Sequence, residues 1–236
     1  MINATLKIQQ LIRTGMLTNL GKALKLEIIS DKAFDWKPYQ TLATWLQQYQ
    51  VIEPNIDALE ILLARLFSLS SINLSNQNIS QVPSTLGALT TIKQLNLSHN
   101  VLSMIPMSLG ILPEIEHLEL QHNQLLALPE SIGLLPTLLH LDLSNNQLSV
   151  LPDSLAQLLH LQYLSLANNQ LLEIPDDLAW LSSLKKLDLQ GNQITIIPIF
   201  IAELQLLDVL NLSNNPIPPK EILNVKKLLP TTKIIH

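Results

Sequence analysis

The chain has 236 residues, enough for one large domain or two small ones, and its composition is skewed towards leucine, which occurs 55 times. With 47% hydrophobic residues the chain has ample apolar side chain for a core, so wholesale disorder is excluded. The absence of cysteine excludes disulfides and cysteine-based zinc sites, and it favours a cytoplasmic location. No apolar stretch is long and uncharged enough to predict a membrane span, and the first residues lack the pattern of a typical secretory signal.

The net charge of −5 is unevenly divided along the chain. Residues 1–68 contain 7 Lys/Arg and 6 Asp/Glu, a net of +1, whereas residues 69–236 contain 7 and 13, a net of −6. A protein that binds duplex nucleic acid needs clustered positive charge to displace counterions, and this chain lacks it. We therefore expect neither a nucleic acid nor a membrane as partner.

Residues 1–68 are predicted to form an N-terminal helical cap. Apolar residues from Leu6 to Leu24 recur at roughly helical spacing, and the segment Asp35-Trp36-Lys37-Pro38 separates them from Tyr39 to Gln50. Asn55 is a suitable N-cap for a further helix that runs to Leu66. This last helix is expected to cover the apolar end of the segment that follows.

From Leu69 onward the sequence repeats with a period of 23 residues. Position 6 of the frame is always leucine, position 9 is asparagine in all frames except the first, which has Gln77, and position 15 is proline in the first six. Seven frames follow one another without an insertion, starting at residues 69, 92, 115, 138, 161, 184 and 207. Such a period is typical of a solenoid, in which each repeat buries its apolar face against its neighbours.

The pattern L-x-x-L-x-L-x-x-N-x-L-x-x-[LIV]-P resembles leucine-rich repeats. Its LPxxL frame is most similar to the intracellular type found in Ras-suppressor and plant Ras-group-related proteins and their bacterial counterparts. The resemblance covers residues 69–229 and implies an α/β solenoid: a right-handed coil with a parallel concave sheet of about seven strands and short helical or 3-10 convex segments. An alternative extends the frame back by 23 residues, which would make residues 46–68 a degenerate repeat.

Each position at which the same residue type recurs from repeat to repeat also has a physical role that can be stated from the residues alone. Positions 4 and 6 point to one face of a short strand, and the asparagine at position 9 can satisfy backbone groups where the chain leaves that strand. Proline at position 15 fixes φ and begins the convex segment. In the second half of the last frame, a helix is expected from Pro218 to Leu229, and residues 230–236 alternate in the manner of a C-terminal cap strand.

The residues that the core does not require occupy positions 2, 3, 5, 7 and 8 of each frame, on or beside the concave sheet. Four of the six histidines lie there, and we expect His117 to neighbour His140 and His99 to neighbour His122. Aromatic side chains within a polar surround favour binding. The predicted partner-binding residues are His99, His117, Glu119, His122, His140, Asp142, Tyr163, Lys186 and Asp188.

The resemblance implies a protein-interaction module, often a signalling scaffold, rather than an enzyme. The acidic residues at position 5 predict a protein partner with a basic surface. No catalytic motif was found, and neither a catalytic residue nor a cofactor is expected. Two alternatives remain open: a secreted bacterial effector that mimics host repeat proteins, and a metal-dependent hydrolase built on the histidine and aspartate patch.

Overall fold

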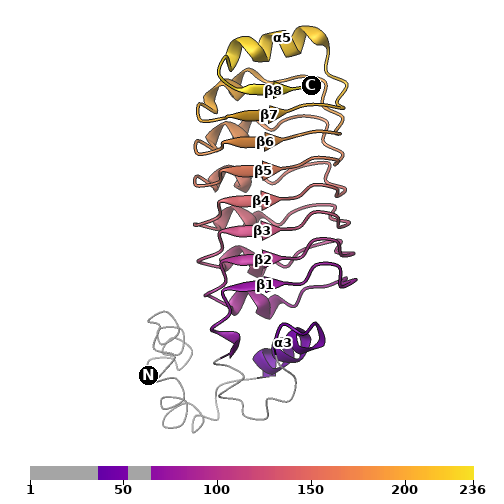
Figure 1. Ribbon diagram of the computed structural model, residues 1–236, viewed down its shortest axis with the longest axis vertical. Coiled ribbons are helices and arrows are strands. Elements are labelled where there is room, and N and C mark those ends of the chain that lie inside the picture. The colour runs from indigo at the N-terminus through magenta and orange to yellow at the C-terminus, as the bar shows by residue number, and fades with distance from the viewer. Residues whose placement is uncertain (1–36, 53–64) are drawn as a thin grey trace.

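The computed structural model describes residues 37–52 and 65–236, which form an elongated stack of coils (Figure 1). The helices predicted between Leu6 and Leu24 and after Asn55 lie almost entirely outside these residues. The division into a cap at 1–68, seven repeats at 69–229 and a cap strand at 230–236 stays a prediction.

Within the described residues, eight strands of three residues each form one open parallel sheet, in which every strand pairs with the next one in the chain. Residues 23 apart face each other across the first seven strands, so that Leu118 pairs with both Leu95 and Leu141. The predicted parallel sheet is therefore confirmed. The strands are β1 (Ser71–Asn73), β2 (Gln94–Asn96), β3 (His117–Glu119), β4 (His140–Asp142), β5 (Tyr163–Ser165), β6 (Lys186–Asp188), β7 (Val209–Asn211) and β8 (Lys233–Ile235).

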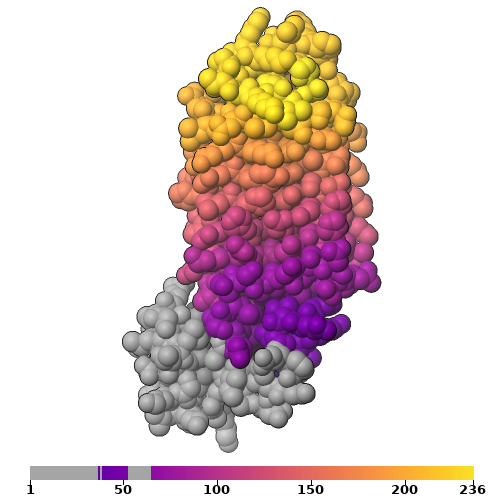
Figure 2. Space-filling model, viewed as in Figure 1, coloured from indigo at the N-terminus to yellow at the C-terminus, as the bar shows by residue number. Residues whose placement is uncertain are grey.

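The leucine excess fills the space between successive coils. The seven leucines at position 6, from Leu74 to Leu212, are at most 2% exposed. Burial of one such side chain contributes about 1.5–3 kcal/mol, and no coil can bury its leucines without the coils on either side. The coils follow one another as layers along the long axis (Figure 2), so the core is one continuous column.

The asparagines at position 9 form a buried ladder that joins each coil to the one before it. Nδ2 of Asn146 donates to the carbonyl oxygens of Leu143 and Leu120, each at 3.0 Å, while its Oδ1 accepts the Leu125 N–H at 3.0 Å. Leu120 and Leu125 belong to the preceding coil. The predicted backbone role is therefore observed, and it extends across the boundary between repeats. Gln77 is exposed, because no earlier strand precedes β1 in the described part of the chain.

Each of six convex segments is a single 3-10 turn that begins directly after the proline at position 15. The six prolines have φ between −59° and −72°, as their rings require. The turns are η2 (Ser84–Ala88), η3 (Met107–Ile111), η4 (Glu130–Leu134), η5 (Asp153–Gln157), η6 (Asp176–Trp180) and η7 (Ile199–Glu203).

Glycine at position 19 allows the first turns to pack closely. A Cβ on Gly110 would overlap the backbone carbonyl of Ser131 in the next coil, and the same holds for Gly87 and Gly133 with their own serine neighbours. In the fourth to sixth repeats this position is alanine, as at Ala156, and the turns pack less closely. These glycines therefore have a packing role, which is to allow close contact between successive coils.

In the part of the chain that the structure describes, one α-helix lies at each end of the stack. Helix α3 (Lys37–Gln48) packs Leu42 and Leu46 into the core at the end where β1 lies, and α5 (Pro219–Leu228) follows the last coil near β8 (Figure 1). The alternative of a degenerate repeat at 46–68 is wrong in its first part, because it requires a strand where α3 ends and a turn follows. None of the helices in residues 37–52 and 65–236 is long and apolar enough to cross a membrane.

Candidate functional site

The side chains at position 3 form a row across four neighbouring strands. The rings of His140 and Tyr163 are stacked, with centroids 4.1 Å apart and planes 5° from parallel, and the ring of His117 lies 5.5 Å from that of His140. On the far side of Tyr163, the Lys186 Nζ lies 5.0 Å from the ring centroid, at the distance of a cation–π contact. Parallel register brings these four residues together, because each occupies the same position of its coil.

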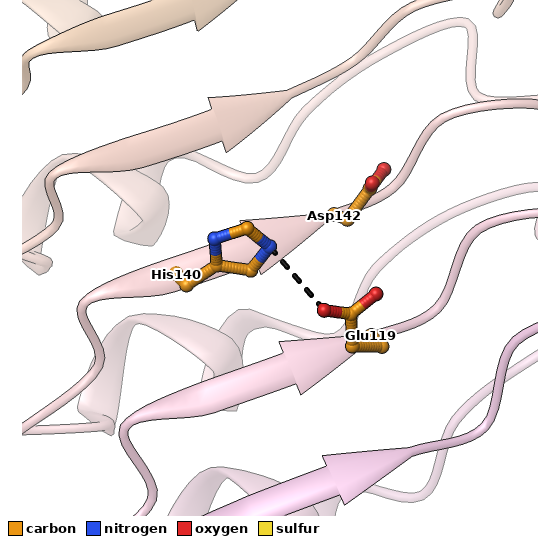
Figure 3. Close-up of side chains that lie close together, drawn as sticks. All are labelled: Glu119, His140 and Asp142. Atoms are coloured by element: carbon orange, nitrogen blue, oxygen red, sulfur yellow. Dashed lines mark ion pairs between the residues drawn. The ribbon is translucent and has the colours of Figure 1, made fainter.

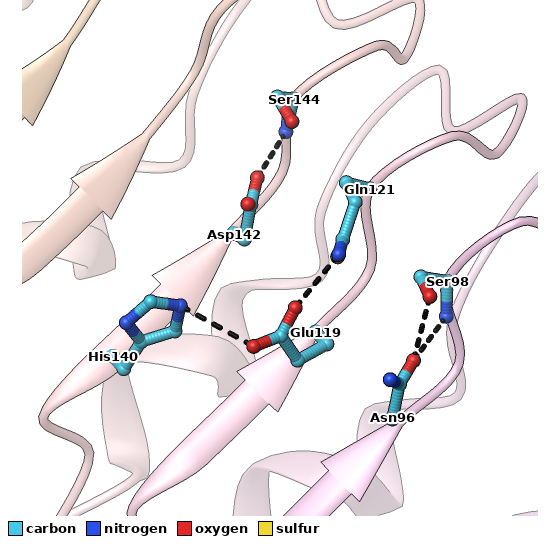
Figure 4. Close-up of polar contacts among 7 residues, drawn as sticks. All are labelled: Asn96, Ser98, Glu119, Gln121, His140, Asp142 and Ser144. Carbon is cyan, nitrogen blue, oxygen red and sulfur yellow. Dashed lines mark hydrogen bonds and ion pairs between the residues drawn. The ribbon is translucent and has the colours of Figure 1, made fainter. Parts of the chain in front are cut away.

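Position 5 has a structural role that the sequence analysis missed. The side-chain oxygens of Asp142 and Asp188 accept the backbone N–H of the residue two places later, at 2.9 and 3.0 Å (Figure 4 shows the first). The asparagines of other coils make the same bond, as Asn96 does with Ser98. These two carboxylates therefore close the turns at the ends of β4 and β6, besides contributing negative charge.

Glu119 departs from this pattern because its side chain is one methylene longer. Its Oε2 accepts a hydrogen bond of 2.7 Å from Nε2 of Gln121, and its Oε1 lies 3.4 Å from Nε2 of His140 (Figure 4). Both Glu119 and His140 are about a quarter to a third exposed, with side-chain values of 30% and 25%. Glu119 is thus an acidic residue of position 5 whose carboxylate turns towards the histidine row.

Burial changes the ionisation of the two central rings. Desolvation lowers the pKa of His140 below its usual value, outweighing the opposing effect of the Glu119 carboxylate. Desolvation also raises the pKa of Tyr163, and the negative charge of Asp142 raises it further. At neutral pH both rings are therefore uncharged, and they form a flat, half-buried platform.

His99 and His122 form a separate stack, with ring centroids 4.2 Å apart and planes 15° from parallel. Their predicted neighbourhood is confirmed, but within residues 37–52 and 65–236 no ring contact or ion pair joins them to the position-3 row. Both lie at position 8, beyond the strand, with φ of 54° and 55°. Asparagine and glycine occupy this position in the other coils, as expected for a left-handed backbone.

We expect the replacement of His122 by valine to lower the free energy of unfolding by about 1–2 kcal/mol, because a β-branched residue is strained at positive φ. The replacement His122→Asn should leave stability within about 0.5 kcal/mol, since asparagine tolerates this conformation. Urea unfolding followed by circular dichroism measures both. Equal losses of stability in the two variants would show that the contacts of the histidine ring matter at this position, and that the positive φ does not.

Two neighbours of the predicted residues were missed. Gln121 anchors Glu119, and a side-chain hydrogen bond links Ser165 with Tyr163. Gln121 has a detectable signal, because position 7 is serine or alanine in all frames except those with Gln121 and Gln190. The small polar residues of the first two coils also leave a hollow of about 250 Å³ over β1 to β3, which His117 and Glu119 border.

The family model described as "Leucine rich repeat" matches residues 67–125, 113–171 and 160–217. A leucine-rich repeat protein of Leptospira interrogans superposes with a TM-score of 0.69 at 32% identity, covering 78% of this chain and 46% of that one. The ectodomain of the Arabidopsis thaliana receptor kinase GASSHO1/SCHENGEN3, in complex with CASPARIAN STRIP INTEGRITY FACTOR 2, gives a TM-score of 0.60 at 32% identity. The match covers 70% of this chain and 21% of that one.

A structure of PEPR1–AtPEP1 gives a TM-score of 0.62 at 29% identity, covering 71% of this chain and 24% of that one. Among curated proteins, no relative matches the sequence. The chain thus spans less than half the length of each of these three structures.

Proposed function

Since the chain belongs to the leucine-rich repeat family, we propose that it is a binding module whose concave face takes a protein segment with a basic surface. The leucine-rich repeat fold is commonly a protein–protein interaction module, typically without enzymatic activity, and structural neighbours of this chain bind peptide or protein partners. The partner of this chain depends on its own variable surface residues. A shared fold does not imply that the structural neighbours have the same residues there.

The observation that carries the proposal is the ordered row of His117, His140, Tyr163 and Lys186. The stacked rings are already held in one geometry, so that this surface would lose little additional side-chain entropy when a partner binds. Half-buried aromatic groups with a polar rim are the usual centre of binding energy in an interface. Beside the row, the hollow over β1 to β3 offers space for a partner's side chain.

Charge supports a basic partner. Glu119, Asp142 and Asp188 lie along the same face, and residues 69–236 have a net charge of −6. Within the described residues Lys186 is the cation of the row, and its contact with Tyr163 places it at one end. A basic segment should therefore associate faster at low ionic strength, because screening shortens the reach of surface charges.

The test is to select peptides from a random library on the wild-type chain and to measure their affinity by titration. The selected peptides should be rich in lysine or arginine. The double variant Tyr163→Ala/Asp142→Asn should bind them at least about tenfold more weakly, through loss of an aromatic anchor and a charge. Asparagine is chosen at 142 because it keeps the turn bond to Ser144, as Asn96 does with Ser98.

Trp180→Ala is the matched control, because this side chain is 67% exposed on the convex side of the coil. It should bind the selected peptides like the wild type. If instead Trp180→Ala weakened binding and the concave double variant did not, the binding surface would be the convex side and the proposal would be wrong.

We also propose a scaffold role in the cytoplasm, supported by the absence of cysteine in all 236 residues. Fractionation of the source cells with an antibody against the chain tests the location. Recovery from the culture medium would contradict it and would favour the alternative of a secreted effector.

A further inference from the structure

Four side chains with metal-binding atoms form a rectangle on two adjacent strands. His117 and Glu119 lie on β3, and His140 and Asp142 lie on β4. Residues two apart in a strand share a face, and parallel register sets His117 opposite His140 and Glu119 opposite Asp142. Two successive coils thus present the paired pattern His-x-Glu and His-x-Asp, which the other coils lack.

Three of these side chains converge on one point. Glu119, His140 and Asp142 each offer a ligand atom, and these atoms all lie within 4.8 Å of one another (Figure 3). Imidazole nitrogen and carboxylate oxygen are ligands that Zn²⁺ accepts, with bonds of about 2.0–2.2 Å. Small rotations of the side chains would therefore bring all three atoms into one coordination sphere.

The convergent groups are held from outside. Oε2 of Glu119 is bound by Gln121 and Oδ1 of Asp142 by the Ser144 N–H, which leaves each carboxylate a second oxygen. The His140 ring is stacked on Tyr163, with its Nε2 directed at Glu119 (Figures 3 and 4). Outer contacts of this kind orient metal ligands and raise the affinity of a site.

The negative charge of the cluster lacks a fixed counterion. Within residues 37–52 and 65–236, no lysine or arginine forms an ion pair with Glu119 or Asp142, and Lys93 pairs instead with Glu116 at 3.0 Å. Two carboxylates beside a neutral imidazole favour a divalent cation over a monovalent one.

We propose that Glu119, His140 and Asp142 bind a divalent cation of the zinc class on the concave face. His117 is the nearest further imidazole, and water or a partner's side chain takes the remaining coordination positions. This site goes beyond the proposed function, since the cation binds the chain without any protein partner. A bound cation would offer a coordination position to a partner, in addition to the stacked rings and the negative charge of the concave face.

Isothermal titration of the untagged full chain with Zn²⁺ near neutral pH tests the proposal. We expect one saturable site. Glu119→Gln, His140→Gln and Asp142→Asn should each weaken Zn²⁺ binding at least about tenfold, because loss of a ligand should cost no less than loss of a residue that only supports a ligand. All three replacements keep the size of the side chain, and Asp142→Asn also keeps an acceptor for Ser144. Circular dichroism verifies that each variant is folded.

Two matched controls separate this site from general binding by histidine and acid. Asp188→Asn alters the same frame position with the same turn bond, and His122→Asn removes a stacked imidazole from the other pair. Both should bind Zn²⁺ like the wild type. Absence of saturable binding up to millimolar Zn²⁺, or equal loss in the controls and the cluster variants, would overturn the proposal, and the peptide-binding measurement remains independent of either result.

Discussion

Replacing Asn146 by alanine should lower the free energy of unfolding by about 2–5 kcal/mol, because the Leu125 N–H is left unsatisfied at a cost of about 1–3 kcal/mol and two further hydrogen bonds of about 0.5–1.5 kcal/mol each are lost. This amide, which is 8% exposed, accepts the Leu125 N–H and donates to the carbonyl oxygens of Leu120 and Leu143. The two carbonyl oxygens also accept from Asn123 and Asn169, so that only the Leu125 N–H is left without a partner. Two of the three groups belong to the preceding coil, so the loss separates neighbouring repeats as well as loosening one. Urea unfolding, followed by circular dichroism, measures the change.

Gln77→Ala is the matched control for Asn146→Ala. Gln77 occupies the same frame position at the first coil, but its side chain is exposed. Its removal should change the free energy of unfolding by no more than about 0.5 kcal/mol, as for other surface substitutions. An equally small effect of Asn146→Ala would mean that water replaces the amide and that the ladder is not essential to the stack.

Replacing Gly110 by alanine should destabilise the protein by about 3 kcal/mol or more, beyond the roughly 1–3 kcal/mol usual for overpacking in a core. The added Cβ would overlap the backbone carbonyl of Ser131, and no change of side-chain rotamer can relieve a clash with backbone. Relief requires η3 and η4 to move apart, which also disturbs the leucine layers beneath them. Thermal and urea unfolding measure the loss.

The reverse replacement, Ala156→Gly, is the control, because alanine occupies this frame position where the next coil presents Asp177 and not serine. It should cost no more than about 1 kcal/mol, the usual entropic effect of glycine. If Gly110→Ala were as stable as the wild type, the turns would be shown to slide apart freely, and the close packing of the first convex turns would have no energetic importance.

Much of the fold could be predicted because contacts in a solenoid join residues at a fixed separation in the sequence. A period of 23 residues already implies that Leu95, Leu118 and Leu141 lie side by side, and the structure pairs them in that register. The pairs His117–His140 and His99–His122 follow from the same arithmetic, and both are observed. Proline at position 15 likewise marks the start of each convex turn.

The candidate site was less predictable, because its geometry depends on side-chain rotamers and on neighbours from other coils. The frame places Glu119 and Asp142 at one position, yet Asp142 closes a turn with Ser144 while Glu119 reaches Gln121 and His140. One methylene decides between these two arrangements. The histidines at position 8 also looked functional in sequence, whereas the positive φ of His99 and His122 supplies a backbone reason for them.

The repeat, the strand register and the identity of the buried leucines could all be predicted from the residues, because each of these depends only on period and polarity. Which polar groups meet is visible only in three dimensions: the asparagine ladder crosses between coils, His140 stacks on Tyr163, and Glu119 turns towards His140. These outcomes depend on distances of an ångström between side chains of different coils. A period fixes the order of such side chains along the sheet, but not the direction in which each one points.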